Sequence, residues 1–275
     1  MLMDPERLLN DVCSIARTAG SFLKSEIHKI SEKNIETKSE HDFVTYVDKA
    51  SEKFLIKELT AIFPEAGIIA EESRQAKNGG RFNWIIDPLD GTSNYIHGMA
   101  PYAVSIALTD YDNEILGVVY EVGQDECFSA SVNGKAKLNN VPIKVSTTPL
   151  LTQSFIATGF PSRDYSRLPE YMELLMALMF DTNGIRRLGS AATDIAYVAC
   201  GRFDIFYEYH LSAWDVAAGS IIVKQAGGKV SDFSGKSNYL FGKEIITSNS
   251  RLHEDFLNLL TKFFDHGQTD HRSKI

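Results

Sequence analysis

Cysteine is scarce in this chain, and long apolar runs are missing. The three cysteines, Cys13, Cys127 and Cys200, are odd in number and widely spaced, which argues against a disulfide framework and against a Cys-rich zinc site. We expect three thiols packed as small apolar groups. No apolar run approaches the ~20 residues needed to cross a bilayer, and no charged segment followed by an apolar one opens the chain. The sequence therefore predicts a cytoplasmic protein that does not enter a membrane.

Positive charge is also in deficit. The 28 lysines and arginines are scattered among 36 aspartates and glutamates, which gives a net charge of −8. Non-specific binding of nucleic acid needs a basic face, so a nucleic-acid partner is disfavoured. An acidic protein still binds an anionic phosphate if metal ions bridge the two, and clustered carboxylates are what such a protein needs.

The 275 residues, 44% of them hydrophobic, have the composition of a globular enzyme with a large core. Asp4 and Pro5 are typical of a helix start, the segment 68–132 is rich in strand patterns, and strands alternate with helices after it. The pattern predicts a mixed α/β fold with two layered sheets and helices between and around them. We expect one domain over 1–265, with two lobes at about 1–145 and 146–265, and a disordered polar tail over 266–275.

Two aspartates at the end of an apolar run carry the first indication of chemistry. Trp84-Ile85-Ile86 is typical of a buried strand and leads to Asp87, and Pro88 favours a turn that brings Asp90 back towards Asp87. Gly91-Thr92 is typical of a helix start, whose amides and positive dipole end suit a phosphate. Hard oxygen ligands of this kind favour Mg²⁺ over zinc or iron. A D-x-x-D pair alone also occurs as a helix cap or in a solvated turn.

Two further acidic positions follow the same pattern. Glu71 comes directly after the apolar run Ile68–Ala70, and a neighbouring strand would bring it beside Asp87, with Glu72 pointing to the opposite side. Asp215 opens an apolar helix, where a simple N-cap is an adequate explanation by itself. The small residues Ala217–Gly219 predict close packing behind it.

Taken together, four segments resemble the inositol monophosphatase family. The match extends from about residue 8 to 262, and four ordered motifs are far more specific than one. An aspartate nucleophile of the haloacid-dehalogenase type is disfavoured, because that motif is D-x-D-G-T and this chain has D-x-x-D-G-T. The matching segments are Asp42–Asp48, Ala70–Ser73, Trp84–Tyr95, and Trp214–Gly219 followed by Gly227-Gly228.

The resemblance implies a layered αβαβα sandwich and a phosphoric monoester hydrolase that uses two or three Mg²⁺ ions. By position in the motifs, one ion would be held by Glu71, Asp87 and the backbone carbonyl of Leu89. A second would be held by Asp87, Asp90 and Asp215, and a third, weaker one would lie near Glu71.

The resemblance also implies roles around the substrate. Thr92 and Asp48 would orient or deprotonate the attacking water, together with Glu71. The positions that would contact substrate are the amides of Gly91 and Thr92 for the phosphate, Glu208 for hydroxyl groups, and the Ser190-Ala191 loop. Arg186 and Arg187 precede that loop, where they would grip a second phosphate or remain solvated cations.

Within the family, the Ser93-Asn94-Tyr95 run resembles the inositol phosphatase branch. We therefore expect hydrolysis of myo-inositol monophosphate, with fructose 1,6-bisphosphate or 3′-phosphoadenosine 5′-phosphate as alternative substrates. A regulatory partner in transcription or RNA metabolism, built on a phosphatase fold, is the alternative of another class. The resemblance further implies a homodimer.

Overall fold

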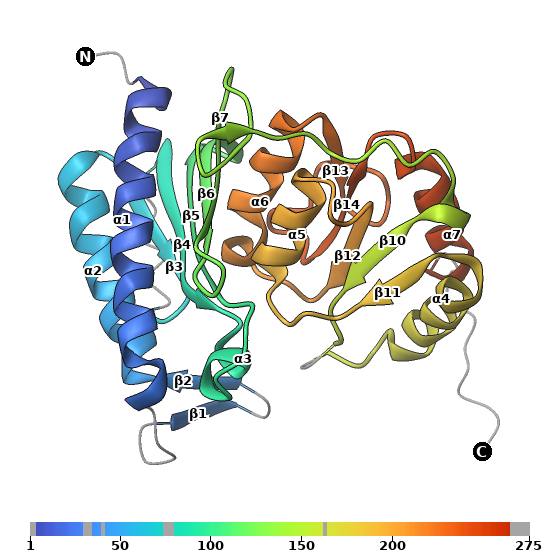
Figure 1. Cartoon of the computed structure of the whole chain (residues 1–275), viewed down its shortest axis with the longest axis horizontal. Coiled ribbons are helices and arrows are strands. Elements are labelled where there is room, and N and C mark those ends of the chain that lie inside the picture. Colours follow the sequence, from blue (N-terminus) through green and yellow to red (C-terminus); the bar gives the residue numbers. More distant parts are fainter. Residues whose placement is uncertain (1–3, 30–34, 40–41, 74–79, 162–163, 265–275) are drawn as a thin grey trace.

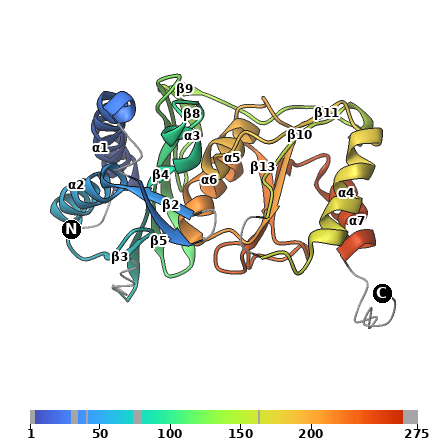
Figure 2. The same cartoon turned by 90° about the horizontal axis from the view of Figure 1, so that it is seen from below.

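Five layers follow one another across the molecule. The computed structural model describes residues 4–29, 35–39, 42–73, 80–161 and 164–264. A pair of helices, a sheet, a second pair of helices, a second sheet and a third pair of helices lie side by side in that order (Figures 1 and 2). The predicted mixed α/β fold and αβαβα sandwich are confirmed. The expected polar tail at 266–275 lies outside the described residues.

The outer layer on one side consists of α1 (Pro5–Glu26) and α2 (Tyr46–Ile62). The predicted cap of α1 is present, because the Asp4 carboxylate accepts a hydrogen bond from the amide of Glu6 at 3.1 Å. α2 begins at Tyr46: Thr45 caps it, and Asp48 lies in its first turn. Both helices bury an apolar face against the first sheet.

The first sheet has seven strands in the order β3-β4-β5-β6-β7-β8-β9. β3 pairs in parallel with β4, and every later pair is antiparallel. Its central strands are buried on both faces because helices cover both sides. The strands span Gly67–Ala70, Phe82–Asp90, Ala103–Asp110, Asn113–Glu121, Glu126–Ser131, Lys137–Leu138 and Val141–Pro142.

The middle layer consists of α5 (Ala191–Ala199) and α6 (Ala213–Gln225), which are packed between the two sheets. Every residue of α5 is buried. The close packing predicted from the small residues of α6 is confirmed, because a Cβ on Gly219 would lie 2.4 Å from Ile195 Cγ2. A larger side chain at that position would force the two helices apart.

The second sheet has five strands in the order β11-β10-β12-β14-β13. β10 pairs in parallel with β11 and β12, and the remaining pairs are antiparallel. The outer helices α4 (Leu168–Asp181) and α7 (His253–Phe264) cover its other face. The strands span Phe155–Thr158, Gly184–Arg186, Ile205–Tyr209, Gly228–Ser231 and Glu244–Asn249.

A few short elements complete the described fold. The two-residue strands β8 and β9 could not be predicted from the sequence, because two residues are too few for a periodic pattern. Within the described residues, no helix is both long and apolar enough to cross a membrane. The short elements not yet named are η1 (Ile27–Lys29), the hairpin β1 (Ile35–Ser39) and β2 (Asp42–Thr45), α3 (Thr92–Ile96) and η3 (Leu151–Gln153).

Candidate active site

A bulge in β4 brings the first two aspartates to one side of the sheet. Asp87 pairs with Ser105 of β5, but Asp90 pairs with Ala103, so three steps along β4 match two along β5. Side chains alternate along a regular strand, so positions 87 and 90 would otherwise face opposite sides. Pro88 has no amide hydrogen to lose at the bulge. The strand was predicted to end at Asp87, but it continues to Asp90.

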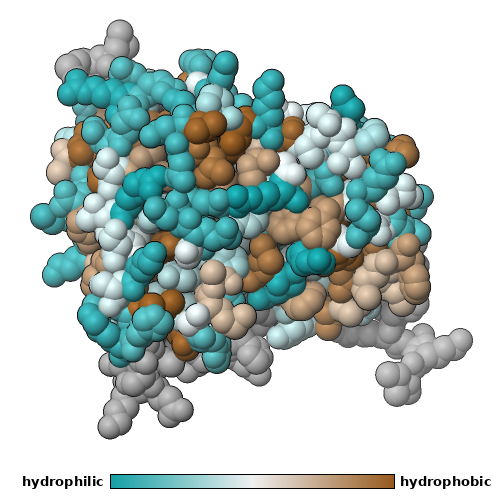
Figure 3. All heavy atoms as spheres, viewed as in Figure 1, coloured by the Kyte–Doolittle hydropathy of each residue, from teal (hydrophilic) through white to brown (hydrophobic). Residues whose placement is uncertain are grey.

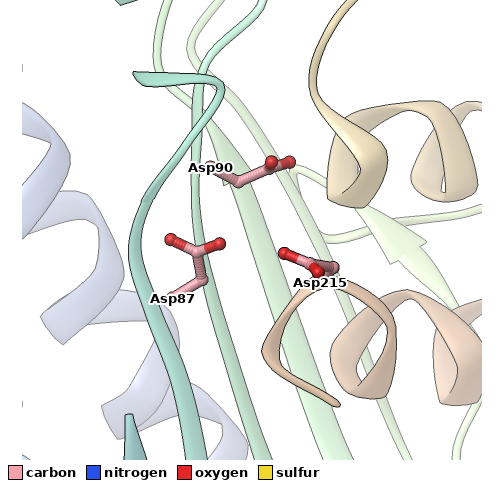
Figure 4. A group of neighbouring side chains, drawn as sticks. All are labelled: Asp87, Asp90 and Asp215. Atoms are coloured by element: carbon pink, nitrogen blue, oxygen red, sulfur yellow. The ribbon is translucent and has the colours of Figure 1, made fainter. Parts of the chain in front are cut away.

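Asp215 comes from α6, which faces β4 across the aspartate group (Figure 4). It lies in the first turn of the helix behind the cap residue Ser212, whose amide donates to an Asp215 oxygen at 2.6 Å. Oxygen atoms of Asp87, Asp90 and Asp215 all lie within 4.8 Å of one another, around a common space (Figure 4). Three carboxylates, two from β4 and one from α6, therefore converge on one point.

Ionising all three carboxylates is unfavourable without a counter-charge. Burial raises the pKa of each, and the neighbouring carboxylates raise the pKa of Asp87 and Asp215 further. The amide of Leu89 donates to Asp87 at 2.9 Å and offsets only part of this cost. A divalent cation removes the repulsion, and carboxylate oxygens are the ligands that Mg²⁺ prefers. The donor set therefore fits a hard divalent metal.

Glu71 lies beside Asp87, as predicted. The parallel register pairs Ala70 with Ile86, and the Glu71 amide donates to the Ile86 carbonyl at 3.3 Å, so Glu71 is next to Asp87 at the strand ends. Its charge raises the pKa of both Asp87 and Asp215. Glu71 is not part of the tightest group, which contains only the three aspartates.

The turn that carries Glu71 is held by a residue that the sequence analysis missed. Glu52 of α2 is buried, and its two carboxylate oxygens accept hydrogen bonds from the amides of Glu72 at 2.7 Å and Ser73 at 2.8 Å. Glu52 lies one helical turn after Asp48, so both acidic residues share a face of α2. That spacing was the only indication of its role in the sequence.

Asp48 and Thr92 are in contact. The Thr92 hydroxyl lies 3.2 Å from an Asp48 oxygen and 2.9 Å from the Leu89 carbonyl oxygen, so two acceptors lie within reach of its single proton. Asp48 is buried, and burial raises its pKa, against hydrogen bonds from Thr45 and Thr92. The same carboxylate thus caps α2 and reaches the hydroxyl above the aspartate group.

Gly91 connects the aspartate pair to the short helix α3. Its φ of +85° is in the left-handed region, and a Cβ would lie 3.0 Å from the Pro101 carbonyl oxygen, so glycine is the residue that fits. The helix that follows, Thr92–Ile96, has only five residues. Any attraction for a phosphate must therefore come from local amides rather than from a long helix dipole.

Ser190 and Ala191 approach the site from α5. The Ser190 hydroxyl donates to Asp90 at 2.6 Å and is 2.7 Å from the Thr193 hydroxyl, and the Ala192 amide donates to the same Asp90 oxygen at 2.8 Å. Ser190 and Ala191 are both buried. Their placement orients Asp90, a function that the resemblance to substrate-lining residues did not indicate.

Glu208 of β12 lies on the α5 side of the aspartate group. Burial raises its pKa to about 8; the Arg187 charge opposes that rise, and Asp90 adds to it. Arg187 is therefore the arginine whose charge influences the site, although its side chain is exposed. Arg186, the one selected from sequence, is also exposed, and its guanidinium lies 4.7 Å from the centre of the Phe155 ring.

Known proteins resemble this chain over most of its length. The model of the inositol monophosphatase family matches residues 4–263. The chain belongs to the inositol monophosphatase family. A relative named Nus factor SuhB, from Pseudomonas aeruginosa, is 38% identical over 264 residues, which are 94% of this chain and 96% of the relative.

Solved structures of the family have the same fold. The extragenic suppressor protein suhB from Bartonella henselae has a TM-score of 0.86 and 35% identity, and the match covers 93% of this chain and 99% of that one. An IMPase from Thermotoga maritima also has a TM-score of 0.86, with 33% identity and coverage of 94% and 98%. The resemblance found in the sequence is confirmed, and membership supports a phosphatase.

Proposed function

We propose that this protein is a Mg²⁺-dependent phosphatase that hydrolyses a small phosphate monoester, with myo-inositol monophosphate as the leading substrate. The observation that carries the proposal is the group of three buried aspartates whose oxygens lie within 4.8 Å of one another. Such a group is costly in an empty protein and useful only with cations. Family membership makes phosphate ester hydrolysis the chemistry to test first.

The metal ligands proposed are Asp87, Asp90, Asp215, Glu71 and the Leu89 carbonyl. When bound, divalent ions lower the pKa of water and stabilise charge on the leaving oxygen. The chain's own residues hold the ligands in place: Ser190 orients Asp90, and the Leu89 amide orients Asp87. A ligand fixed by a second hydrogen bond keeps its geometry as cations and substrate exchange.

Thr92 and Asp48 are proposed to position the attacking water. The Thr92 hydroxyl lies 3.2 Å from Asp48 Oδ1. A water bound next to Thr92 would donate a hydrogen bond to the hydroxyl oxygen, which would in turn donate to the Asp48 carboxylate. A raised pKa makes Asp48 a better proton acceptor than an exposed aspartate. The amides of Gly91 and Thr92 would hold the phosphate.

The surroundings of Glu208 favour a neutral polyol over a bisphosphate. Burial raises the pKa of both Glu208 and Asp194, so below about pH 8 the Glu208 carboxyl is neutral and carries a proton to donate. The hydroxyl groups of inositol would meet the Glu208 carboxyl, which both donates and accepts hydrogen bonds near pH 8.

A phosphate-release assay tests the proposal. Purified protein should release phosphate from inositol monophosphate with added Mg²⁺ and lose that activity in a chelator. Asp90→Asn and Asp215→Asn should each lower kcat by more than about 100-fold with an unchanged circular dichroism spectrum. Asp112→Asn, in an exposed turn, is the matched control. Near-normal kcat in both site variants would refute the assignment, and fructose 1,6-bisphosphate and 3′-phosphoadenosine 5′-phosphate serve as competing substrates.

A second candidate is a regulatory role in transcription. It is favoured by the relatives named Nus factor SuhB, among them one from Escherichia coli that is 38% identical over 246 residues. The acidic composition disfavours direct contact with nucleic acid, so a protein partner is the form to test. Co-purification with RNA polymerase from the native host would support this role, and retention of the partner by Asp90→Asn would separate it from catalysis.

The expected homodimer also remains a proposal. The helix α4 exposes Met172, Met176, Met179 and Phe180, and apolar side chains gather over this region at the lower right of the surface (Figure 3). A single patch related to itself by a two-fold axis suits a dimer. Light scattering should give a dimer mass for the native chain and a monomer mass for the double variant Met176→Glu, Met179→Glu. A native monomer would exclude it.

A further inference from the structure

A polar cavity lies on the outer face of the first sheet, away from the aspartate group. It has a volume of about 200 Å³ and lies between α1 and β7. Two of the three cysteines line it, Cys13 from α1 and Cys127 from β7, and both are free thiols. Cys127 is 3% exposed, whereas Cys13 is partly exposed at the cavity wall. The proposed phosphatase chemistry uses neither residue.

A fixed arginine stands over the same cavity. The Arg17 guanidinium donates to Asp125 at 2.8 Å and to the Asn139 side-chain oxygen at 2.5 Å, and that oxygen also accepts from the Cys127 amide at 3.0 Å. Its guanidinium lies 5.2 Å from the centre of the Tyr120 ring. Three contacts therefore hold the cation in place beside the thiols.

The two thiols differ in acidity. The pKa of the Cys13 thiol is lowered by a hydrogen bond with Cys127; burial opposes this, while Ser129 and the charges of Arg17 and Lys137 add to it. The pKa of Cys127 is raised by its hydrogen bond with Cys13 and by burial. The thiolate is the reactive form of cysteine, and Cys13 is the partly exposed sulfur that lines the cavity with Arg17, whereas Cys127 is 3% exposed. Cys13 is therefore the nucleophile of the pair. Cys127 is a protonated neighbour.

The charges in the cavity select the kind of reagent. Arg17 and Lys137 are cations near the sulfur atoms, with Asp125 as the acidic counter-charge to Arg17. A soft metal cation would meet this positive charge and only two sulfur ligands, fewer than a structural thiolate site provides. A small neutral oxidant has no such penalty, and the volume of the cavity admits one.

We propose that this cavity is a thiol-modification site, in which Cys13 reacts with a hydroperoxide and Cys127 resolves the product to a disulfide. The Cys13 thiolate attacks the outer peroxide oxygen, the O–O bond breaks, and the leaving alkoxide takes a proton to become an alcohol, or water from hydrogen peroxide. Cys13 is then a sulfenic acid. The Cys127 sulfur attacks the Cys13 sulfur, and the departing hydroxide takes the Cys127 proton as water.

The third cysteine provides an internal control. Cys200 is also partly exposed, but burial raises its pKa, with the Arg202 charge opposing that rise. At neutral pH, iodoacetamide should label Cys13 on the order of tenfold faster than Cys200. After treatment with equimolar hydrogen peroxide, a non-reducing peptide map should contain the Cys13 and Cys127 peptides joined and Cys200 free. Equal labelling rates, or oxidation of Cys200 before Cys13, would overturn the proposal.

Variants separate the two roles. In Cys127→Ala the sulfenic acid on Cys13 should accumulate and be captured by dimedone, and in Cys13→Ala neither adduct nor disulfide should form. Arg17→Gln should slow the labelling of Cys13 towards the rate of Cys200, whereas Arg7→Gln, exposed on the same helix, should not. Sulfenic acid that persists in the native chain without a cross-link would remove Cys127 from the scheme. The labelling comparison uses the native chain, so it stands even where a variant fails to fold.

Discussion

At the scale of single residues, Asp48 has both a structural role and a proposed catalytic one. Asp48 accepts hydrogen bonds from the amide and the hydroxyl of Thr45, at 2.8 and 2.6 Å, and also from Thr92. The same buried carboxylate therefore fixes the start of α2 and reaches the proposed water position. Substitution of Asp48 would mix a folding defect with a catalytic one, which makes Thr92 the better residue to change.

Thr92 should be required for turnover through its hydroxyl alone. Thr92→Ala removes the group that contacts Asp48, and we expect kcat to fall by about 100-fold or more, the usual scale for proton-transfer groups. Thr92→Ser keeps the hydroxyl and should stay within a few-fold of the native kcat. Both are measured by phosphate release at saturating Mg²⁺. A serine variant as inactive as the alanine variant would show that the methyl group matters and the hydroxyl does not.

Glu208 should make the metal-free protein less stable as the pH rises. Its pKa is about 8 in the fold and near 4.5 in an unfolded chain, so between these values the folded protein binds the extra proton. Stability falls with pH wherever the folded state binds more protons. Between about pH 5 and 8.5, the thermal midpoint of the native chain should therefore fall more than that of Glu208→Gln, which has no proton to lose. Parallel midpoint curves for the two proteins would contradict the raised pKa.

At the scale of elements, the site depends on the hydrogen bonds between α2 and the turn that follows β3. Glu52 joins the two by accepting the amides of Glu72 and Ser73, and the Ser51 hydroxyl donates to the Pro88 carbonyl at 3.2 Å. One turn of α2 thus contacts both strand ends that carry proposed metal ligands. A change in this turn should alter metal affinity without touching a ligand.

Glu52→Gln should weaken Mg²⁺ binding. An amide has one acceptor oxygen where the carboxylate has two, so one of the two backbone amides loses its partner. Loss of a residue that orients metal ligands costs about 10- to 100-fold in metal affinity, which titration calorimetry measures directly. Glu58→Gln makes the same chemical change on the same helix, where Glu58 pairs with the exposed Lys57 at 2.9 Å. Equal affinity in Glu52→Gln and Glu58→Gln would exclude the orienting role.

The sequence predicted which elements carry the acidic residues, but not how the side chains of Asp87 and Asp90 come to lie on the same face of the sheet. The apolar runs before Glu71 and Asp87 located the strand ends, and the parallel register that brings these residues together followed from adjacency. The bulge between Asp87 and Asp90 has no periodic pattern of its own, since it is one extra residue in a strand. Glu52 was missed for a related reason: its partners are backbone amides, which every residue except proline offers.

At the scale of the whole molecule, the proposed site forms where three layers meet. The first sheet supplies Asp87 and Asp90, the middle layer supplies Asp215, and the second sheet supplies Glu208 from β12. Layer order was predictable, because alternating strands and helices bury their apolar faces in few ways. Which arginine influences Glu208 was not, since Arg186 and Arg187 are adjacent and both exposed, and only the folded structure places Arg187 close enough to affect the pKa of that carboxyl.

Because the aspartates sit between layers, Mg²⁺ should stabilise the whole fold, and more so at higher pH. Their raised pKa values mean that the metal-free fold keeps protons that the unfolded chain loses above about pH 4, so its stability falls as the pH rises. A cation binds the ionised carboxylates and competes with those protons. The increase in thermal midpoint on adding Mg²⁺ should therefore be larger at about pH 8 than at about pH 5.5. Differential scanning calorimetry of the native chain and of Asp215→Asn measures this increase. The variant should show a smaller increase at both pH values. An equal increase in both proteins would place the stabilising ion elsewhere.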